Sequence, residues 1–401
     1  MTSALFRRLC ARFLRPARPR EPSPGLRNAF ARNTDFGAGN CHCCCASTRA
    51  VVPRYGERVK TPPIRVTLVD GHGPGPAVCA AVRAVLKATA APVEWDRQPV
   101  SVHRDPTTGR PIVNAELLES VAETRVILHG PVPDTASDGS QVSTTLTLHK
   151  ALRASVGVQP FASVDGHRPF GHVRMVNVRD NVSGEYSENE HLVTPGVVQS
   201  IKTVTRQHSE AVARFAFEYA VANGHYHVTA LHKANVMRMS DGTFLKACRS
   251  VSTDYPDVDY REEKLDKFCL RVTNDPCRYD MLLTPSLYGA IASAAVSALV
   301  GGPATVPYMA FGSDVAVFGT MYDGPAICRK DVISEPVINP TGIIRSAAWM
   351  LGHLEMPDKR LLIETALNET IRQGVKTRDM GGTACCEEYT DAIVHNISRL
   401  S

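Results

Sequence analysis

The stretch Val228–Gly242, VTALHKANVMRMSDG, carries the most information about the fold of this 401-residue chain. Its first residues, Val228–Leu231, form a short apolar run typical of a buried strand. The polar segment His232–Asn235 follows directly, and Asp241-Gly242 indicates a turn before a helical pattern over Thr243–Val251. A strand that passes through polar residues into a helix is the repeating unit of α/β proteins.

The same alternation of strands and helices extends along the rest of the chain. A strand over Ile64–Asp70 ends in glycines, and apolar residues at helical spacing follow over Pro76–Ala90. We therefore expect α/β sheets covered by helices. Further strands are predicted over Arg125–Leu128, Val173–Val178, Tyr279–Thr284 and Val315–Phe318, and further helices over Asn114–Glu123, Val197–Asn223, Ser286–Val300, Thr341–Leu354, Lys359–Gly374 and Cys385–Leu400.

The composition is that of a globular protein with room for two domains. Hydrophobic residues make up 43% of the chain and charged residues 21%. No apolar run reaches the ~20 residues that a membrane helix needs, so we expect no membrane partner.

The net charge of +5 comes from the front of the chain. Residues 1–34 carry eight arginines and one acidic residue, Glu21, whereas the remainder holds 37 basic and 39 acidic residues. The near-neutral body argues against nucleic-acid binding. The Arg-rich front, with an amphipathic pattern over Met1–Leu14, predicts a mitochondrial transit peptide and disordered leader over residues 1–50, and hence a place in the mitochondrial matrix. The alternative is a disordered basic tail.

The twelve cysteines do not predict a metal site. Four of them cluster around His42 within Cys41–Cys45, but a second, separated ligand pair is absent. The others are scattered, as reduced thiols in an intracellular protein usually are.

Several segments resemble the isocitrate and isopropylmalate dehydrogenase family, and its NAD-dependent isocitrate dehydrogenases in particular. Val228–Gly242 is the most specific of them. Arg65–Pro76 (RVTLVDGHGPGP) is similar to the family's opening strand and glycine turn, and Arg179–Tyr186 (RDNVSGEY) to its Arg-Glu-Asn-Thr-Glu-Gly-Glu-Tyr motif. The resemblance runs from about residue 55 to the end of the chain, and its other segments are Gly196–Ile201, Ser286–Gly289 and Asn339–Thr341.

The resemblance implies two domains with a cleft between them. A large domain is expected from residues 60–155 and 291–401, and a small domain, through which members of the family dimerise, from residues 156–290. The cleft of a catalytic member holds substrate, magnesium and NAD. It oxidises a 2-hydroxy acid by hydride transfer, the metal polarises the new carbonyl, and carbon dioxide leaves.

Two positions of this chain depart from the catalytic pattern at the metal. Where the family helix has two aspartates, this chain has Ala290 and Ala294. Alanine offers no oxygen to a hard cation. We therefore do not expect this chain's own cleft to hold Mg²⁺, and we expect no NAD there either.

The substrate positions are also changed. The resemblance keeps Ser143 and a third substrate arginine, Arg179, and it keeps the proton donor as Tyr186. Arg179 has an alternative role as an ion-pair partner of Glu185, and Tyr186 as a packed aromatic residue. Thr145, His149 and Gln159 stand where the family has Asn, Arg and Arg. We expect His149 to be solvated or hydrogen-bonded rather than a ligand.

The NAD-binding loop is altered as well. Gly319–Pro325 replaces the family's His-Gly-Thr-Ala-Pro loop. Asn339 is a candidate for adenine binding, and its alternative role is a turn residue before Pro340.

The residues that a family member lends to its neighbour are all present. They are Lys233 and Asn235 of the His-Lys-Ala-Asn segment, and Asp266, which would also contribute to the partner's metal. Taken alone, Lys233 would be an ordinary surface lysine after a strand.

The sequence thus predicts a noncatalytic, regulatory-type subunit of NAD-dependent isocitrate dehydrogenase, inactive by itself, in a complex that uses NAD and Mg²⁺. Its partner would be a catalytic subunit, and its small-molecule ligands isocitrate or citrate and ADP. One alternative is an independent NAD-dependent dehydrogenase of another 2-hydroxy acid. Another is a metabolite-sensing pseudoenzyme.

Overall fold

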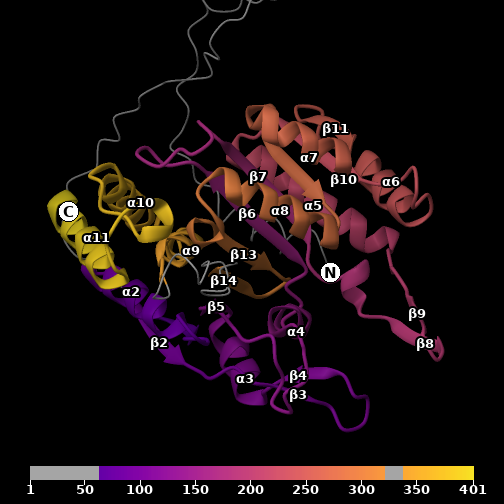
Figure 1. Ribbon diagram of the computed structural model, residues 1–401, viewed down its shortest axis with the longest axis horizontal. Helices are drawn as coiled ribbons and strands as arrows, with labels where there is room; N and C mark the ends of the chain where they lie inside the picture. Colours follow the sequence, from indigo (N-terminus) through magenta and orange to yellow (C-terminus); the bar gives the residue numbers. More distant parts are fainter. Residues whose placement is uncertain (1–62, 321–336) are drawn as a thin grey trace, which may run out of the picture.

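A computed structural model describes residues 63–320 and 337–401, and these form an α/β fold around one large sheet (Figure 1). Within the described residues this sheet has ten strands in the order β11-β10-β12-β7-β6-β13-β14-β5-β1-β2. In sequence order the ten are β1 (Ile64–Val69), β2 (Val93–Arg97), β5 (Val126–His129), β6 (Val156–Ala162), β7 (Arg174–Asp180), β10 (His227–His232), β11 (Asp259–Lys264), β12 (Met281–Thr284), β13 (Pro307–Phe311) and β14 (Ala316–Thr320).

The sheet consists of two parallel blocks joined by antiparallel strands. β11, β10, β12 and β7 are parallel to one another, and so are β14, β5, β1 and β2. Between the blocks, β6 pairs antiparallel with β7, and β13 pairs antiparallel with β6 and β14. The sequence patterns predicted several strands of both blocks, but not the two strands that join them.

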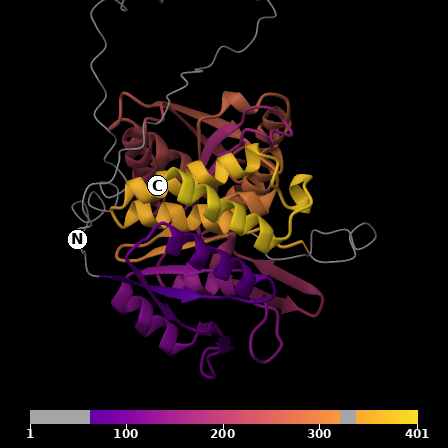
Figure 2. The same ribbon diagram turned by 90° about the vertical axis from the view of Figure 1, so that its left-hand side faces the viewer.

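Helices cover both faces of the sheet. Their bounds are α2 (Gly75–Ala88), α3 (Ala115–Thr124), α4 (Thr144–Ala151), α5 (Arg206–Asn223), α6 (Ser240–Ser252), α7 (Leu265–Asn274), α8 (Ser286–Leu299), α9 (Thr341–His353), α10 (Pro357–Arg372) and α11 (Cys386–Leu400). α10 and α11 run side by side across the large sheet, as Figure 2 shows.

Successive residues of each strand point to opposite faces, so the core is divided. On the first face, residues such as Val176 and Phe318 pack in one cluster with α2, α5, α6, α9, α10 and α11. On the second face there are two separate clusters. One, around Met175, contains α7 and α8, and the other, around Val317, contains α3 and α4. The strip of sheet between these two clusters is lined by polar side chains, among them Gln159, Asn177 and Arg179. We call it the polar strip.

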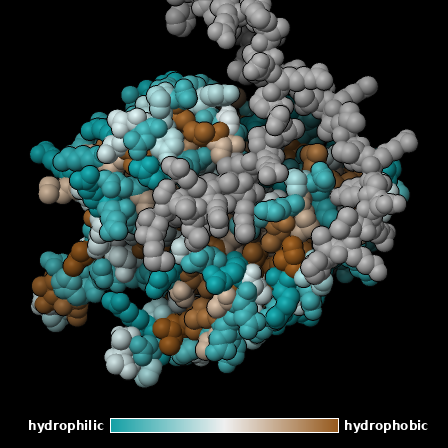
Figure 3. All heavy atoms as spheres, turned by 180° about the vertical axis from the view of Figure 1, so that it is seen from behind, coloured by the Kyte–Doolittle hydropathy of each residue, from teal (hydrophilic) through white to brown (hydrophobic). Residues whose placement is uncertain are grey.

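A hairpin extends away from the body of the molecule. It consists of the antiparallel strands β8 (Glu190–Thr194) and β9 (Val197–Ser200). A separate small antiparallel sheet consists of β3 (Val102–Arg104) and β4 (Pro111–Val113). The hairpin's Leu192 is 63% exposed and its Val198 62% exposed. Figure 3, seen from behind, shows hydrophobic atoms on the projection at lower left, where this hairpin lies.

The predicted helix over Val197–Asn223 is wrong at its start. Val197–Ser200 forms β9, and α5 begins only at Arg206, where the Thr205 hydroxyl accepts a hydrogen bond from the backbone N–H of His208 at 3.3 Å. Gly196, with φ of +83°, turns the chain ahead of the strand. The apolar residues before Thr205 belong to an exposed hairpin. Their spacing in the sequence matches that of apolar residues on one face of a helix.

The other predicted elements are confirmed to within a few residues. Among the residues that the structure describes, no helix is both long and apolar enough to cross a membrane. The predicted leader, the helix over Met1–Leu14 and the cluster Cys41–Cys45 lie outside the described residues, as does most of the loop Gly319–Pro325. The domain boundaries stay a prediction.

The close approach of β7 to α8 depends on Gly289. A Cβ atom at this position would overlap with Cγ of Arg179 and with Oγ1 of Thr284. Gly242, in the first turn of α6, offers a matched contrast because a Cβ there would meet nothing within 4 Å.

We predict opposite effects of adding a methyl group at these two helical glycines. Gly289→Ala should lower the free energy of unfolding by about 1–3 kcal/mol because of overpacking. Gly242→Ala should raise it by about 0.5–1 kcal/mol because alanine favours the helix. Urea unfolding followed by circular dichroism measures both, and equal effects of the two substitutions would contradict the packing at Gly289.

Candidate functional site

The polar strip lies between α4 and α8, and Ala290 and Ala294 stand on α8 next to Gly289 and Ser293, which contact the strip. Ala290 is partly exposed and Ala294 is exposed. Neither side chain carries an oxygen, and no group of three His, Cys, Asp or Glu side chains in the described parts of the chain could hold a metal. The residues at this position therefore do not fit a magnesium ion.

Arg179 is buried at the end of β7, in the middle of the strip. Its Nε donates to Oδ1 of Asn181 at 3.1 Å, and its guanidinium lies 3.5 Å from the hydroxyl of Tyr308. The alternative pairing with Glu185 is wrong, because Glu185 pairs with Lys202 at 3.2 Å. Among the described residues, Arg179 has no carboxylate partner, so it stays available to an anion.

Gln159 faces the same strip but is held in a buried network. Its Oε1 accepts a hydrogen bond from Ser293 of α8 at 2.6 Å. Asn177 of β7 donates to Ser293 at 2.8 Å and accepts from Thr284 at 2.9 Å. Since Gln159 is 1% exposed and engaged with α8, it serves packing between strand and helix.

His149 is buried in α4 against Tyr308. Nε2 of His149 lies 3.4 Å from the Tyr308 hydroxyl, and the two ring centroids are 5.5 Å apart. Burial lowers the pKa of His149 well below the usual range of histidine, and His129 and Arg179 lower it further. His149 is therefore a neutral, hydrogen-bonded residue. This is one of the two alternatives expected from the sequence, the other being a solvated residue.

Ser143 and Tyr186 belong to short helical elements: Ser143 precedes α4, and Tyr186 is the middle residue of a single helical turn. The Ser143 hydroxyl caps α4 by accepting from the backbone N–H of Leu146 at 3.3 Å. Tyr186 is half-buried in a short 3-10 helix over Glu185–Ser187, and its hydroxyl has no hydrogen-bond partner among the described residues. Tyr186 thus stays free to exchange a proton or a hydrogen bond with a ligand.

A buried carboxylate positions the segment after β10. Asp241, 1% exposed, accepts hydrogen bonds from Lys202 at 2.8 Å and from the backbone N–H of Lys233 at 2.7 Å. Burial lowers the pKa of Lys202, but the hydrogen bond and charge of Asp241 outweigh this effect and raise it overall. Lys202 also lies 4.5 Å from the ring centroid of Tyr288. The ion pair therefore joins the base of the hairpin to the loop that carries Lys233.

The structure brings together two of the three residues predicted to serve a neighbour. Nζ of Lys233 lies 2.7 Å from Oδ1 of Asp266, at the start of α7. The hydrogen bond from Lys233 lowers the pKa of Asp266. Asn235 is exposed in the loop between β10 and α6, and Val236 and Met239 beside it are 66% and 86% exposed.

Asn339 has both ends of its amide engaged within the chain. Nδ2 donates to Asp379 at 2.8 Å, and Oδ1 accepts from the backbone N–H of Thr341 at 2.9 Å. This geometry supports the alternative role as a turn residue that begins α9. It leaves the adenine contact a prediction.

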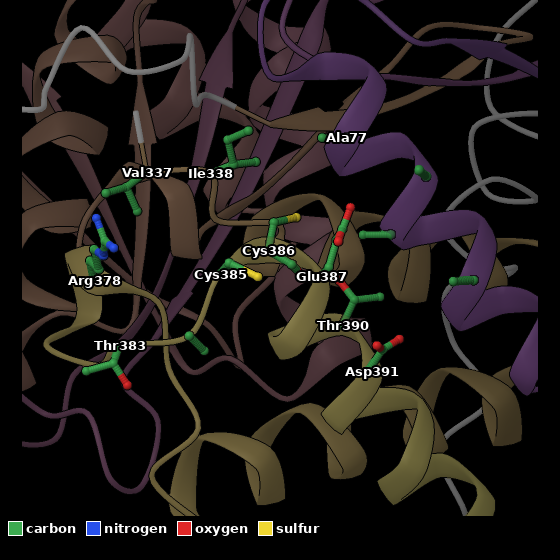
Figure 4. A pocket seen from close by; sticks show the side chains of 14 residues that line it. Ala77, Val337, Ile338, Arg378, Thr383, Cys385, Cys386, Glu387, Thr390 and Asp391 are labelled. Atoms are coloured by element: carbon green, nitrogen blue, oxygen red, sulfur yellow. Dashed lines mark hydrogen bonds between the residues drawn. The ribbon is translucent and has the colours of Figure 1, made fainter. Parts of the chain in front are cut away.

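A pocket of about 520 Å³ lies next to Asn339, between α2 and α11. Val337 and Ile338 line it with the alanines of α2, as Figure 4 shows. Cys385 and Cys386 also line it, and the thiol of Cys385 accepts from the backbone N–H of Glu388 and caps α11. Two carboxylates, Glu387 and Asp391, and one cation, Arg378, line it, so the pocket has no excess of positive charge to attract the phosphates of a dinucleotide.

Sequence reasoning missed several residues of the site. Asp241 was interpreted only as part of a turn, and neither Lys202 nor Tyr308 belonged to a recognised motif. The signal for Asp241 was its place at the start of a helix, where a carboxylate is favoured. Nothing in the local pattern around Tyr308 indicates that its hydroxyl meets both His149 and Arg179.

We predict a pH dependence of stability that comes from His149. The unfolded chain binds a proton at His149 below about pH 6.5, whereas the folded chain does not. The free energy of unfolding should therefore fall as the pH falls, by up to about 1.4 kcal/mol per pH unit from this group. Urea unfolding from pH 7 downward should give a smaller slope for His149→Gln than for the unsubstituted chain, and equal slopes would show that His149 is charged in the fold.

The chain is similar to known proteins over most of its length. Residues 65–393 match the family model of isocitrate/isopropylmalate dehydrogenase. A mitochondrial regulatory subunit of isocitrate dehydrogenase [NAD] from Dictyostelium discoideum is 38% identical over 336 residues, 83% of this chain and 92% of that protein. The mitochondrial alpha subunit of isocitrate dehydrogenase [NAD] from Sus scrofa is 38% identical over 356 residues, 88% of this chain and 94% of that protein.

A solved structure agrees with these relatives. The isocitrate dehydrogenase of Methylococcus capsulatus matches with a TM-score of 0.76 and 31% identity, over 83% of this chain and 99% of that one. The names of the two relatives confirm the predicted mitochondrial location. One relative is named as regulatory and the other as alpha, both at equal identity, so the names do not distinguish the two types. The chain belongs to the isocitrate/isopropylmalate dehydrogenase family.

Proposed function

We propose that this chain is a noncatalytic, regulatory-type subunit of mitochondrial NAD-dependent isocitrate dehydrogenase. The complex converts isocitrate and NAD to 2-oxoglutarate, carbon dioxide and NADH, and a catalytic partner supplies the metal-binding cleft. The observation that carries the proposal is the pair Ala290 and Ala294 on α8, where the resemblance expects metal-binding aspartates.

The substrate positions support the same proposal. His149 is neutral and Gln159 is hydrogen-bonded to Ser293, so neither offers a cation to a substrate carboxylate. Two missing arginine contacts at about 1.5–3 kcal/mol each weaken substrate binding by roughly 10²–10⁴. Missing metal electrostatics add a further barrier of about 3 kcal/mol.

The residues predicted for the partner's cleft have a geometry suited to that role. Lys233 and Asp266 form a mutual ion pair at the surface, and Asn235 is exposed nearby. The exposed apolar side chains of the β8–β9 hairpin and of Val236 and Met239 provide area that a second subunit would bury. A partner chain seated there would receive the Lys233 ammonium, which handles protons in the family reaction.

A metabolite-sensing role is the second candidate, and Arg179 favours it. The guanidinium is buried without a carboxylate partner in the described parts of the chain, which is an arrangement that attracts an anion. The candidate ligands are citrate and ADP. Because the positions of His149 and Gln159 no longer carry arginine, we expect binding in this cleft to be weak.

We predict that Lys233→Ala lowers the activity of the complex. Co-purified with a catalytic isocitrate dehydrogenase subunit, the variant should reduce kcat by on the order of 100-fold or more at the cleft that it completes, because a group that transfers protons is lost. NADH formation measures the effect, and size-exclusion chromatography checks that the complex still forms. Lys246→Ala, an exposed lysine on α6, is the control and should keep full activity. Full isocitrate turnover by the isolated chain would refute the proposal.

We also predict that the isolated chain shows no saturable Mg²⁺ binding at millimolar concentration. Calorimetric titration with MgCl₂ distinguishes this proposal from an independent dehydrogenase, which needs its own metal. Replacing Ala290 and Ala294 together with Asp should create measurable binding, since carboxylates are the ligands Mg²⁺ uses. Replacing Ala290 and Ala294 together with Asn is the matched control, because it adds side chains of the same size without the negative charge, and it should bind Mg²⁺ far more weakly. Metal binding by the unsubstituted chain would favour the independent dehydrogenase.

A further inference from the structure

A second pocket, of about 300 Å³, lies on the opposite face of the sheet from the polar strip. We propose that it binds a small polyanion that carries phosphate or carboxylate groups, at a site separate from the cleft. It lies where α5 and the strands β6 and β7, from the middle of the chain, meet α9 and α10 from its C-terminal part.

The alternation of side chains along β7 separates this pocket from the cleft. Arg174 and Arg179 are five residues apart on the same strand, so their side chains point to opposite faces. Arg179 lies against α8 on the second face, whereas Arg174 and Val176 line the pocket on the first. A ligand in the pocket would touch none of the residues assigned to the cleft.

The pocket has an excess of positive charge. Three arginines line it, and the one carboxylate among its lining residues is Glu364. Nε of Arg360 pairs with Glu364 at 3.1 Å, and the same guanidinium lies 3.4 Å from the ring centroid of Trp349. The charge of Arg360 is therefore already balanced by Glu364, and its guanidinium stacks on Trp349. Arg174 and Arg345 are the two arginines that remain for a ligand.

Neither Arg345 nor Arg174 forms a salt bridge with a carboxylate among the residues that the structure describes, although Glu364 is close enough to act on Arg345 electrostatically. Arg345 is half-buried in α9, and its Nη1 donates to the backbone carbonyl of Thr305 at 3.1 Å. One neutral acceptor leaves most of its N–H donors available to solvent or to a ligand. Since a charge shielded from water is costly unless it is paired, an anion in the pocket would stabilise the half-buried Arg345, and the exposed Arg174 would add a second contact.

The neighbouring polar groups are compatible with an anion. Asp280, the nearby acid, is occupied by His225, whose Nδ1 lies 2.5 Å from it, and by the backbone N–H of Tyr226 at 2.8 Å. Asn368 of α10 lines the pocket and offers an amide donor. The volume is at the lower end for small-molecule sites, which suits a compact anion such as pyrophosphate or a tricarboxylate.

The position of the pocket gives the ligand a structural effect. An anion held by Arg174 of β7 and Arg345 of α9 would link the two parallel blocks of the sheet from the face opposite the cleft. Guanidinium groups bind phosphate and carboxylate through two parallel hydrogen bonds, so the link would also be directional.

Isothermal titration of the purified full-length chain with pyrophosphate and, separately, with citrate tests the proposal. We expect saturable binding of at least one of the two anions, and preference between them identifies phosphate or carboxylate as the chemistry recognised. Arg345→Gln should weaken this binding about 10- to 100-fold, which corresponds to loss of a charged hydrogen-bonding group. Arg174→Gln, at an exposed side chain that the fold does not need, should weaken it as well.

Two control variants locate the bound anion. Arg110→Gln removes the same charge from an exposed position in the turn between β3 and β4 and should leave binding unchanged. Arg179→Gln should leave binding at the pocket unchanged, because Arg179 lies on the other face of the sheet, and in the citrate titration it should remove only the weaker binding proposed for Arg179. The proposal is overturned if the folded chain binds neither anion, if binding is unaffected by both pocket variants, or if Arg179→Gln abolishes it. Circular dichroism confirms that each variant is folded.

Discussion

The ion pair between Asp241 and Lys202 is the interaction on which the candidate functional surface depends. Asp241 is inside the protein, yet it faces a lysine ammonium and a backbone N–H, so its charge is paired and hydrogen-bonded. Removing one partner of such a buried pair typically costs about 3–5 kcal/mol, because the other charge is left uncompensated. Through this pair, the base of the hairpin and the loop with Lys233 and Asn235 keep a fixed relation to one another.

The two faces of the large sheet differ in how their side chains pack. The first face buries one continuous hydrophobic cluster beneath six helices and supplies most of the apolar packing. The second face has two smaller clusters with a polar strip between them, where Arg179, His149 and Tyr308 meet. This strip lies where the antiparallel strands β6 and β13 join the two parallel blocks of the sheet.

The fold class and most helices could be predicted from the sequence, because apolar spacing and glycine turns are local signals. The hairpin was mistaken for a helix because Val197, Ile201 and Val204 are spaced as on a helical face, although the hairpin leaves Val197 and Ile201 exposed. The resemblance supplied Lys233 and Asp266, and the structure added their contact. The contacts of Arg179 with Tyr308 and of Asp241 with Lys202 could not be predicted, since the two residues of each pair are distant in sequence and only the tertiary fold brings them close.

The contact between Lys233 and Asp266 has a consequence for assembly. Both side chains are partly open to water, at 32% and 62% exposure, and pairs of this kind contribute only about 0–1 kcal/mol. By itself, the chain therefore holds the Lys233 ammonium against the Asp266 carboxylate, and neither group extends alone into solvent. If a partner chain takes these two groups over, as proposed, breaking their mutual contact costs little energy, and salt, which weakens that contact, lowers the cost further.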